Sequence, residues 1–160
     1  MGAGKSSYGR KLAKTIGFRF IDMDTHIEEL EGMKVSDIFS QRGEQWFRAK
    51  ETEVLHLLGE MEEDLIIATG GGVPCFNNNM DFINSNGISV YLKLSAEALV
   101  MKLSSSNKSL RPLLVGKKDQ ELLDYVKQKL SEREQFYQLS KIIVPAEKLN
   151  IETLKARLKL

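Results

Sequence analysis

The sequence predicts an α/β protein in which a parallel sheet has helices on both faces. Short apolar runs alternate with helical patterns along the whole chain, the order expected when each strand is followed by a helix. The apolar run at 65–68 shows no polar alternation, which is typical of a strand buried on both faces. A glycine-rich stretch at the start leads directly into a helical pattern, and such a junction can present backbone N–H groups to an anion.

The first half of the chain supplies two of the expected strands. We predict a helix at 6–16 that ends at Gly17, a strand at 18–22, and a longer helix from about 44 to 59. Between them, Thr25 and Glu28 have the spacing of a capping box, Ser36 can cap a second short helix through Phe39, and Arg42-Gly43 forms a turn. The strand at 65–68 then runs into Thr69 and three glycines.

The second half repeats the alternation. The pattern predicts, in order, a helix at 77–86 ended by Gly87, a strand at 88–94, a helix at 96–103, a long amphipathic helix at 119–139, a strand at 142–144 and a helix at 151–160. The stretch 104–118 is polar, lacks apolar periodicity and is typical of a mobile loop. No repeat or domain boundary interrupts the series, so we expect a single domain over 1–160.

Composition excludes several functional classes. A chain of 160 residues with 42% hydrophobic and 28% charged residues is an ordinary globular chain that can bury a core. Its net charge of +1 gives no electrostatic reason to expect nucleic acid or a membrane surface as a partner. No apolar run approaches the ~20 residues of a membrane span, and no signal peptide is visible. Cys75 is the only cysteine, so we expect a reducing compartment, the cytoplasm.

The stretch G-A-G-K-S-S matches the last positions of a phosphate-binding loop, G-x-x-x-x-G-K-[ST]. In such a loop Lys5 contacts the β- and γ-phosphates and the Ser6 hydroxyl ligates Mg²⁺. A flexible glycine-rich segment without function is the alternative, and the motif alone does not decide between the two. The loop's first glycine and the apolar strand that should precede it are not in the sequence. We therefore expect a truncated chain, or a Met1 that is an internal methionine of a longer one.

Two further groups stand where strands of an α/β sheet end, the edge at which such sheets bind ligands. Asp22 and Asp24 follow the strand at 18–22, and a turn at Met23 could bring both carboxylates to one cleft, one near a metal and one near a substrate hydroxyl. A solvated strand exit is the alternative. Gly70, Gly71 and Gly72 follow the strand at 65–68, where backbone N–H groups could approach a ligand closely, although a simple turn is also consistent.

Three arginines are candidates for an anionic substrate, because the guanidinium fork matches a carboxylate or phosphate. Arg48 lies on the helix after Gly43, Arg111 in the polar loop, and Arg133 on the long helix. Any one of them alone is most often a solvated surface residue. His26 and His56 lack metal-ligand spacing with Cys75 or with each other, so we expect them at the surface.

Six motifs in order, G-A-G-K-S-S, D-M-D, G-E-Q-W-F-R, T-G-G-G, R-P-L-L and R-E-Q-F-Y, resemble the shikimate kinase family over nearly the whole chain. The resemblance implies ATP-dependent phosphorylation of the 3-hydroxyl of shikimate, giving shikimate 3-phosphate and ADP, with Mg²⁺. It also implies a P-loop kinase fold with strand order 2-3-1-4-5, whose first strand is missing from this sequence. A shikimate-binding segment at about 25–50, a lid at about 104–118 and a monomeric enzyme are expected as well.

The resemblance also assigns roles. Gly2, Ala3, Gly4, Lys5, Ser6 and Ser7 would hold the ATP phosphates, with Ser6 on Mg²⁺ and Asp22 in the outer shell of the metal. Asp24 would bind substrate hydroxyls and act as the base, Arg48 and Arg133 would hold the carboxylate, and Gly71, with Gly70 and Gly72, the ring hydroxyls. Arg111 would reach over the phosphates from the closed lid. Lys102 stands where an arginine beside adenine is usual, which leaves the adenine contacts, including those from 146–150, open.

Two rival interpretations follow from the same motifs. One is another small-molecule P-loop kinase, such as a gluconate or nucleoside monophosphate kinase, which would not need Asp24, Arg48 and Arg133 to converge on a carboxylate. The other is a non-catalytic, truncated nucleotide-binding fragment.

Overall fold

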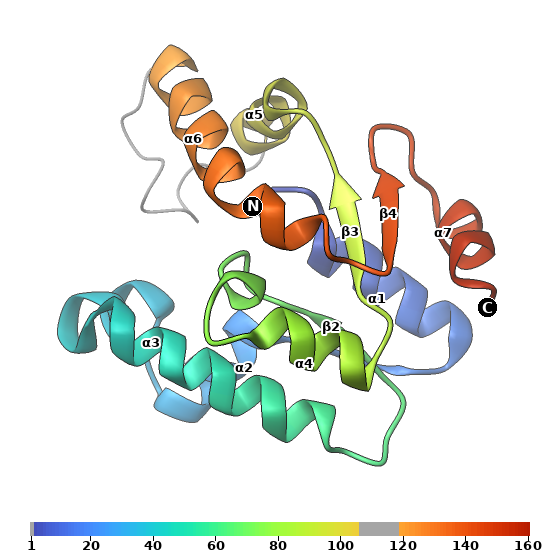
Figure 1. Ribbon diagram of the computed structural model, residues 1–160, viewed down its shortest axis with the longest axis horizontal. Helices are drawn as coiled ribbons and strands as arrows, with labels where there is room; N and C mark the ends of the chain where they lie inside the picture. Colours follow the sequence, from blue (N-terminus) through green and yellow to red (C-terminus); the bar gives the residue numbers. More distant parts are fainter. Residues whose placement is uncertain (1, 106–118) are drawn as a thin grey trace.

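Two pairs of parallel strands form the centre of the computed structural model, which describes residues 2–105 and 119–160 (Figure 1). Strand β1 (Arg19–Asp22) pairs with β2 (Leu65–Ala68), and β3 (Val90–Lys93) pairs with β4 (Ile142–Pro145). The predicted parallel α/β architecture is confirmed. If the expected first strand is counted as strand 1, these two pairs are the outer pairs of the order 2-3-1-4-5. No ladder joins the two pairs within the described residues.

Helix α1 (Lys5–Ile16) packs against both β1 and β2 and also contacts α7 (Ile151–Leu158). It approaches the strands closely, because a Cβ atom at Gly9 would lie 2.8 Å from the ring of Phe20. The predicted end is confirmed: Gly17 is left-handed, with φ of 80°, and its N–H donates to the carbonyl of Ala13. The phosphate-loop motif is therefore fixed to the helix that lies on the strands.

The predicted capping box at Thr25 is wrong. Helix α2 (Met23–Glu31) begins as soon as β1 ends, because the side chain of Asp22 accepts a hydrogen bond from the backbone N–H of Thr25 and caps the helix. Thr25 is therefore inside the first turn. Glu28 instead accepts hydrogen bonds from the backbone N–H of Val35, at 2.9 Å, and from Lys34, at 2.8 Å.

Helix α3 (Val35–Gly59) follows Lys34, so Ser36 is not its cap. The predicted turn at Arg42-Gly43 is present as an interruption of this helix, since Gly43 has φ of 83° and ψ of 167°. The two parts of α3 correspond to the two helices expected there, and the second ends at Gly59 as predicted.

The remaining elements follow the expected order with small shifts at their ends. They are α4 (Asn79–Asn86), α5 (Ala96–Ser105) and α6 (Asp119–Tyr137). A short 3₁₀-helix, η1 (Val73–Cys75), was not predicted. Helix α4 begins two residues later than predicted because Asn77 and Asn78 adopt left-handed backbone angles. The predicted lid at 104–118 lies almost entirely outside the described residues. No described helix is both long enough and apolar enough to cross a membrane.

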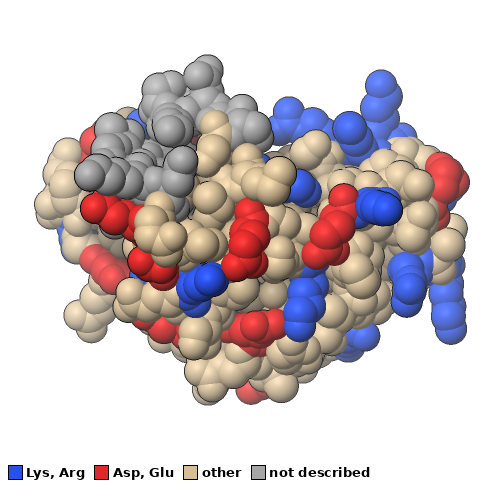
Figure 2. Space-filling view, turned by 90° about the horizontal axis from the view of Figure 1, so that it is seen from above, with Lys and Arg blue, Asp and Glu red and all other residues tan. Residues whose placement is uncertain are grey.

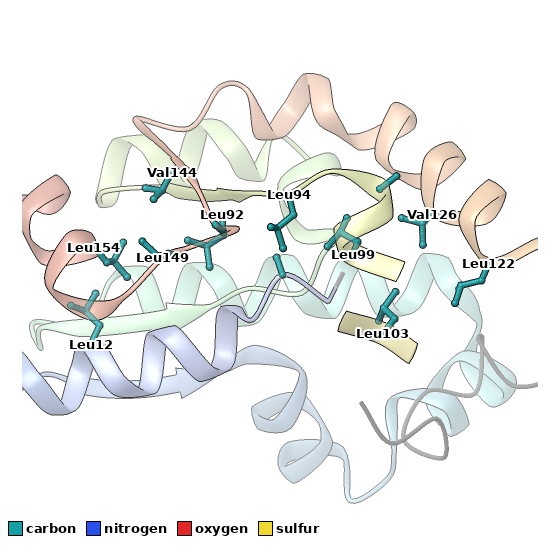
Figure 3. Packing of buried hydrophobic residues seen from close by; sticks show 13 residues of the cluster. Leu12, Leu92, Leu94, Leu99, Leu103, Leu122, Val126, Val144, Leu149 and Leu154 are labelled. Carbon is teal, nitrogen blue, oxygen red and sulfur yellow. The ribbon is translucent and has the colours of Figure 1, made fainter. Parts of the chain in front are cut away.

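Two hydrophobic cores stabilise the molecule. The first core surrounds β1 and β2 and draws on α2, α3 and η1; its buried members include Ile21, Met23, Ile38, Phe47, Leu55 and Val73. The second core surrounds β3 and β4 and draws on α1, α5, α6 and α7. Figure 3 shows that it is elongated, with Leu12 beside Leu154 at one end, Leu92 between, and Val126 at the other end. Each fully buried aliphatic side chain contributes about 1.5–3 kcal/mol. Helix α6 belongs to the second core but also contacts η1, so it connects the two.

Candidate active site

Glycines shape the phosphate-loop segment, residues 2–7. Gly2 has φ of 70° and Gly4 has φ of 92°, backbone angles that other residues adopt only with strain. Helix α1 begins directly after Gly4, whose carbonyl accepts the N–H of Tyr8 at 2.9 Å. Lys5, Ser6 and Ser7 thus occupy the first turn, where the positive end of the helix dipole favours an anion.

Asp22 links this first turn to α2. The hydroxyl of Ser6 donates a hydrogen bond to one carboxylate oxygen of Asp22, and the other oxygen accepts from the N–H of Thr25 at 3.4 Å. Hydroxyl and carboxylate oxygens are ligands that Mg²⁺ prefers. The donor set therefore fits the predicted metal position at Ser6 and Asp22.

Asp24 lies in the first turn of α2, beside the same loop. Desolvation by the surrounding protein raises the pKa of Asp24 above its ordinary value of 3.8, and the Asp22 carboxylate raises it further, while Lys5 and Arg48 oppose the shift. The buried Met23 separates the two aspartates, and the helical turn that starts there brings both carboxylates into one electrostatic environment. The predicted turn at Met23 is confirmed in this form.

Arg48 and Glu51 form a buried ion pair on one face of α3. The Arg48 Nη1 and Glu51 Oε2 atoms are 2.6 Å apart, and the two side chains are 12% and 2% exposed. Arg48 forms a second ion pair with Glu44, in which Nη2 and Oε1 are 2.9 Å apart. The ring centroids of three phenylalanines lie 4.7–5.7 Å from the guanidinium carbon: Phe39, Phe47 and Phe76. Burial raises the pKa of Glu51, although Arg48 counteracts this. Arg48 is therefore fixed rather than a solvated surface residue.

The glycine turn, Gly70–Gly72, packs against these charged groups. A Cβ atom at Gly70 would lie 2.7 Å from Glu51 Oε1 and 2.9 Å from Asp24 Oδ1. A Cβ atom at Gly72 would lie 2.7 Å from the guanidinium carbon of Arg48. The turn thus has no room for a side chain at Gly70 or Gly72, which is why glycine is required at these two positions.

Helix α6 approaches the other side of the glycine turn. The Tyr137 hydroxyl donates a hydrogen bond of 2.6 Å to the carbonyl of Gly71. Arg133, one helical turn earlier, interacts electrostatically with Glu51, Cys75 and Tyr137. Arg133 and Arg48 therefore both interact electrostatically with the buried carboxylate of Glu51, so the structure brings the two arginines into one region; their binding of a substrate carboxylate stays a prediction.

A cavity of about 450 Å³ opens beside the phosphate loop. Its lining includes Gly4, Ser7, Tyr8, Lys11, Lys102, Leu149, Asn150 and Ile151. The Tyr8 hydroxyl donates to the Leu149 carbonyl at 2.9 Å, and the Asn150 side chain caps α7 through the N–H of Thr153. Lys102 and part of the 146–150 segment thus lie where the nucleotide contacts were expected.

Most predicted site residues belong to this connected region, but Arg111 lies outside the described residues. His26 is partly exposed, and His56 is exposed and stacks on Phe82. Sequence reasoning missed the role of Glu51, although its position three residues after Arg48 on a helix was a usable signal. It also gave no role to Tyr137, which lies four residues after Arg133.

Comparisons of the sequence with known proteins show the family of the chain. The shikimate kinase family profile matches residues 1–158. Shikimate kinases of Parabacteroides distasonis and Bacteroides fragilis are 44% and 45% identical to the chain, over 96% and 93% of its length and 87% and 82% of theirs.

Solved structures give the same result. The crystal structure of shikimate kinase from Bacteroides thetaiotaomicron superposes with a TM-score of 0.95 at 38% identity, covering 100% of this chain and 94% of that one. Shikimate kinase from Acinetobacter baumannii in complex with shikimate has a TM-score of 0.86 at 31% identity, covering 99% and 86%. The family profile matches nearly the whole sequence, and shikimate kinases are similar to the chain both in sequence and in solved structure. The chain therefore belongs to the shikimate kinase family.

Proposed function

We propose that this protein transfers the terminal phosphoryl group of ATP to the 3-hydroxyl of shikimate, giving shikimate 3-phosphate and ADP. The observation that carries the proposal is the convergence of Arg48, Arg133 and Asp24 around the glycine turn, beside the phosphate loop. A substrate with a carboxylate at one end and hydroxyls at the other needs cations and a carboxylate in this arrangement. An acceptor without an acidic group gives no reason for two arginines beside the same turn. Gluconate also carries a carboxylate and hydroxyls, so the acceptor assay described below distinguishes it from shikimate.

Arg48 and Arg133 bind the substrate carboxylate in this proposal. Each charge-assisted hydrogen bond to a carboxylate contributes about 1.5–3 kcal/mol when it is sheltered from water. Glu51 holds Arg48 in place through the 2.6 Å ion pair, so the guanidinium is oriented before the substrate arrives. The amide of Gly71, with its neighbours Gly70 and Gly72, contacts the ring hydroxyls.

Asp24 accepts the proton of the 3-hydroxyl as the oxygen attacks the γ-phosphorus, and the bond from that phosphorus to the β-phosphate oxygen breaks. The raised pKa of Asp24 supports this role, because a base is more effective when its pKa approaches the working pH. Lys5, in the first turn of α1, lies close enough to influence Asp24 and can neutralise charge on the transferring group.

Mg²⁺ is proposed at Ser6 and Asp22, whose oxygen atoms suit it. The ion, when bound, neutralises negative charge on the β- and γ-phosphates. The described residues contain no group of three or more His, Cys, Asp or Glu side chains that could hold a metal ion. Mg²⁺ in kinases is usually bound largely by phosphate and water oxygens.

The remaining assignments concern the nucleotide and the state of the enzyme. We propose that the cavity beside the phosphate loop receives adenine, with Lys102 and the 149–150 segment at its wall, and that Arg111 reaches the phosphates from a lid at 104–118. A cytoplasmic monomer that acts on a small molecule rather than on nucleic acid or membranes is also proposed. Supporting this, acidic and basic side chains are interspersed across the middle of the face in Figure 2, and the net charge is +1.

The test is a coupled assay of ADP release with shikimate, gluconate and nucleoside monophosphates as alternative acceptors. Shikimate should be the acceptor, and Arg133→Ala should raise its KM roughly ten- to a hundredfold with little effect on the KM for ATP, because one charged partner of the carboxylate is lost. Lys127→Ala, which removes an exposed charge from the same helix, is the matched control. Preference for another acceptor, or equal changes in both KM values, would contradict the proposal.

A further inference from the structure

Tyr137 joins the two halves of the site. It ends α6, which belongs to the second core, yet its hydroxyl bonds to Gly71, 66 residues away in sequence and in the glycine turn beside the first core. Its ring packs on Tyr91 with centroids 5.1 Å apart, which fixes the direction of the hydroxyl. Arg133 lies within reach of the same hydroxyl.

The Gly71 carbonyl differs from the other two carbonyls of the glycine turn. Gly70 accepts from the N–H of Val73 at 3.2 Å, and Gly72 accepts from the N–H of Cys75 at 2.8 Å, so both are fixed by their immediate neighbours. The Gly71 carbonyl receives the Tyr137 hydroxyl and, at 3.9 Å, the weak donor thiol of Cys75. Its orientation therefore depends on a distant helix.

Orienting this carbonyl also orients an N–H group. A trans peptide is planar, so the Gly71 carbonyl and the Gly72 N–H point in opposite directions. Glycine has the widest backbone freedom, and a glycine–glycine peptide without a partner for its carbonyl can rotate readily. The same peptide sets the position of Gly72 against the Arg48 guanidinium.

Tyr137 remains a donor over the working pH range. Burial raises the pKa of its hydroxyl, although Arg133 partly counteracts this, so the group stays protonated near neutrality.

We propose that Tyr137 is a positioning residue that fixes the Gly71–Gly72 peptide and couples it to Arg133, so that the glycine turn and both arginines meet the substrate as one preformed unit. This inference rests on the proposed phosphorylation of shikimate. It does not make Tyr137 a catalytic residue, because the hydroxyl acts through the turn.

The experiment compares the wild type with Tyr137→Phe, which removes only the hydroxyl, and with Tyr91→Phe as the matched control on the facing ring. In the ligand-free protein, backbone amides of residues 70–73 should exchange with deuterium faster in Tyr137→Phe than in the other two proteins. In the assay, Tyr137→Phe should raise the KM for shikimate about three- to tenfold and leave the KM for ATP unchanged.

Coupling to Arg133 is tested by the double variant. If the two residues act as one unit, Tyr137→Phe should weaken shikimate binding less in an Arg133→Ala background than in the wild type. Unchanged amide exchange, an equal rise in both KM values, or fully additive effects would overturn the inference. If the wild-type protein does not phosphorylate shikimate, the proposed function is wrong. Amide exchange would still show whether Tyr137 fixes the glycine turn.

Discussion

The phosphate loop and the glycine turn are both glycine-rich, but they need glycine for different reasons. In the loop, Gly2 and Gly4 have φ of 70° and 92°, a region where a side chain strains the backbone. In the turn, no glycine has a positive φ, and Gly72 has φ of −87°. There the constraint is space, since a Cβ atom would collide with Glu51, Asp24 or Arg48. One segment uses glycine for conformation and the other for close approach.

This difference decides what else each segment depends on. Strain at a backbone angle is local, so no distant substitution can relieve it. A steric limit is set by a neighbour, and removing the neighbour removes the limit. Three substitutions test this distinction, and the first removes Arg48, the neighbour of Gly72.

Arg48→Ala should have the largest effect on stability. It leaves the Glu51 carboxylate buried without its partner, a change that destabilises proteins by roughly 3–5 kcal/mol. Denaturant unfolding at pH 7 measures the loss. Lys50→Ala, two residues along the same helix and paired with Glu31 and Glu53, is the control and should cost much less.

The free energy of unfolding that Arg48→Ala loses relative to the wild type should increase with pH. Without Arg48, the pKa of Glu51 in the folded variant rises further above its ordinary value of 4.5. A group whose folded-state pKa is raised favours folding when it is protonated, and this contribution is lost as pH rises through the raised pKa. The deficit relative to the wild type should therefore be smallest near pH 4.5 and grow towards neutrality. A deficit independent of pH would mean that Glu51 is not the cause.

Gly72→Ala should have an intermediate effect, about 1–3 kcal/mol, because its Cβ atom would displace the Arg48 guanidinium. The KM for shikimate should rise more than the KM for ATP. In an Arg48→Ala background the same substitution should be nearly harmless to stability, since the clash no longer exists. Additive losses of unfolding free energy would show that the glycine is needed for its backbone instead.

Gly4→Ala should have the smallest effect on stability, about 1–2 kcal/mol, from a left-handed backbone angle that alanine tolerates poorly. Here the informative comparison is Gly4→Asn, which should unfold less readily than Gly4→Ala because asparagine visits this region more easily. At position 72 the order should reverse, with asparagine worse than alanine. The same order at both positions would remove the distinction between the two segments.

Much of the fold was predictable because its signals are local. The strand at 65–68 and the helix end at Gly17 were predicted at the correct residues from apolar pattern and glycine alone. The start of α2 was not, because Thr25 and Asp22 are both good caps and the exit of β1 decides which one reaches the free N–H groups. The left-handed Asn77 and Asn78 likewise carry no distinct signal in the sequence.

The site was predictable as a set of residue types but not as a network. Ordered motifs predicted Lys5, Asp24, Arg48 and Arg133 as site residues, and the structure places them near the phosphate loop and the glycine turn. Glu51 is one of many acidic residues in a helix, and its burial depends on tertiary packing around α3, including the close approach of Gly70. The Tyr137 bond to Gly71 joins distant segments, and a single sequence contains no direct record of such a contact.

The two cores also differ in when they can form. The first core is formed by residues from one stretch of the chain, 21–83. The second core contains both Leu12 and Leu154, so it brings together residues from near the two ends of the sequence. Closing the longer loop has the larger entropic penalty and slows the contacts that require it. We infer that, during synthesis, the first core can assemble while the chain is still growing. Arg133 and Tyr137 are added only with α6, so a half-made chain would have a folded β1–β2 unit but would lack two of the residues proposed to bind or position the substrate.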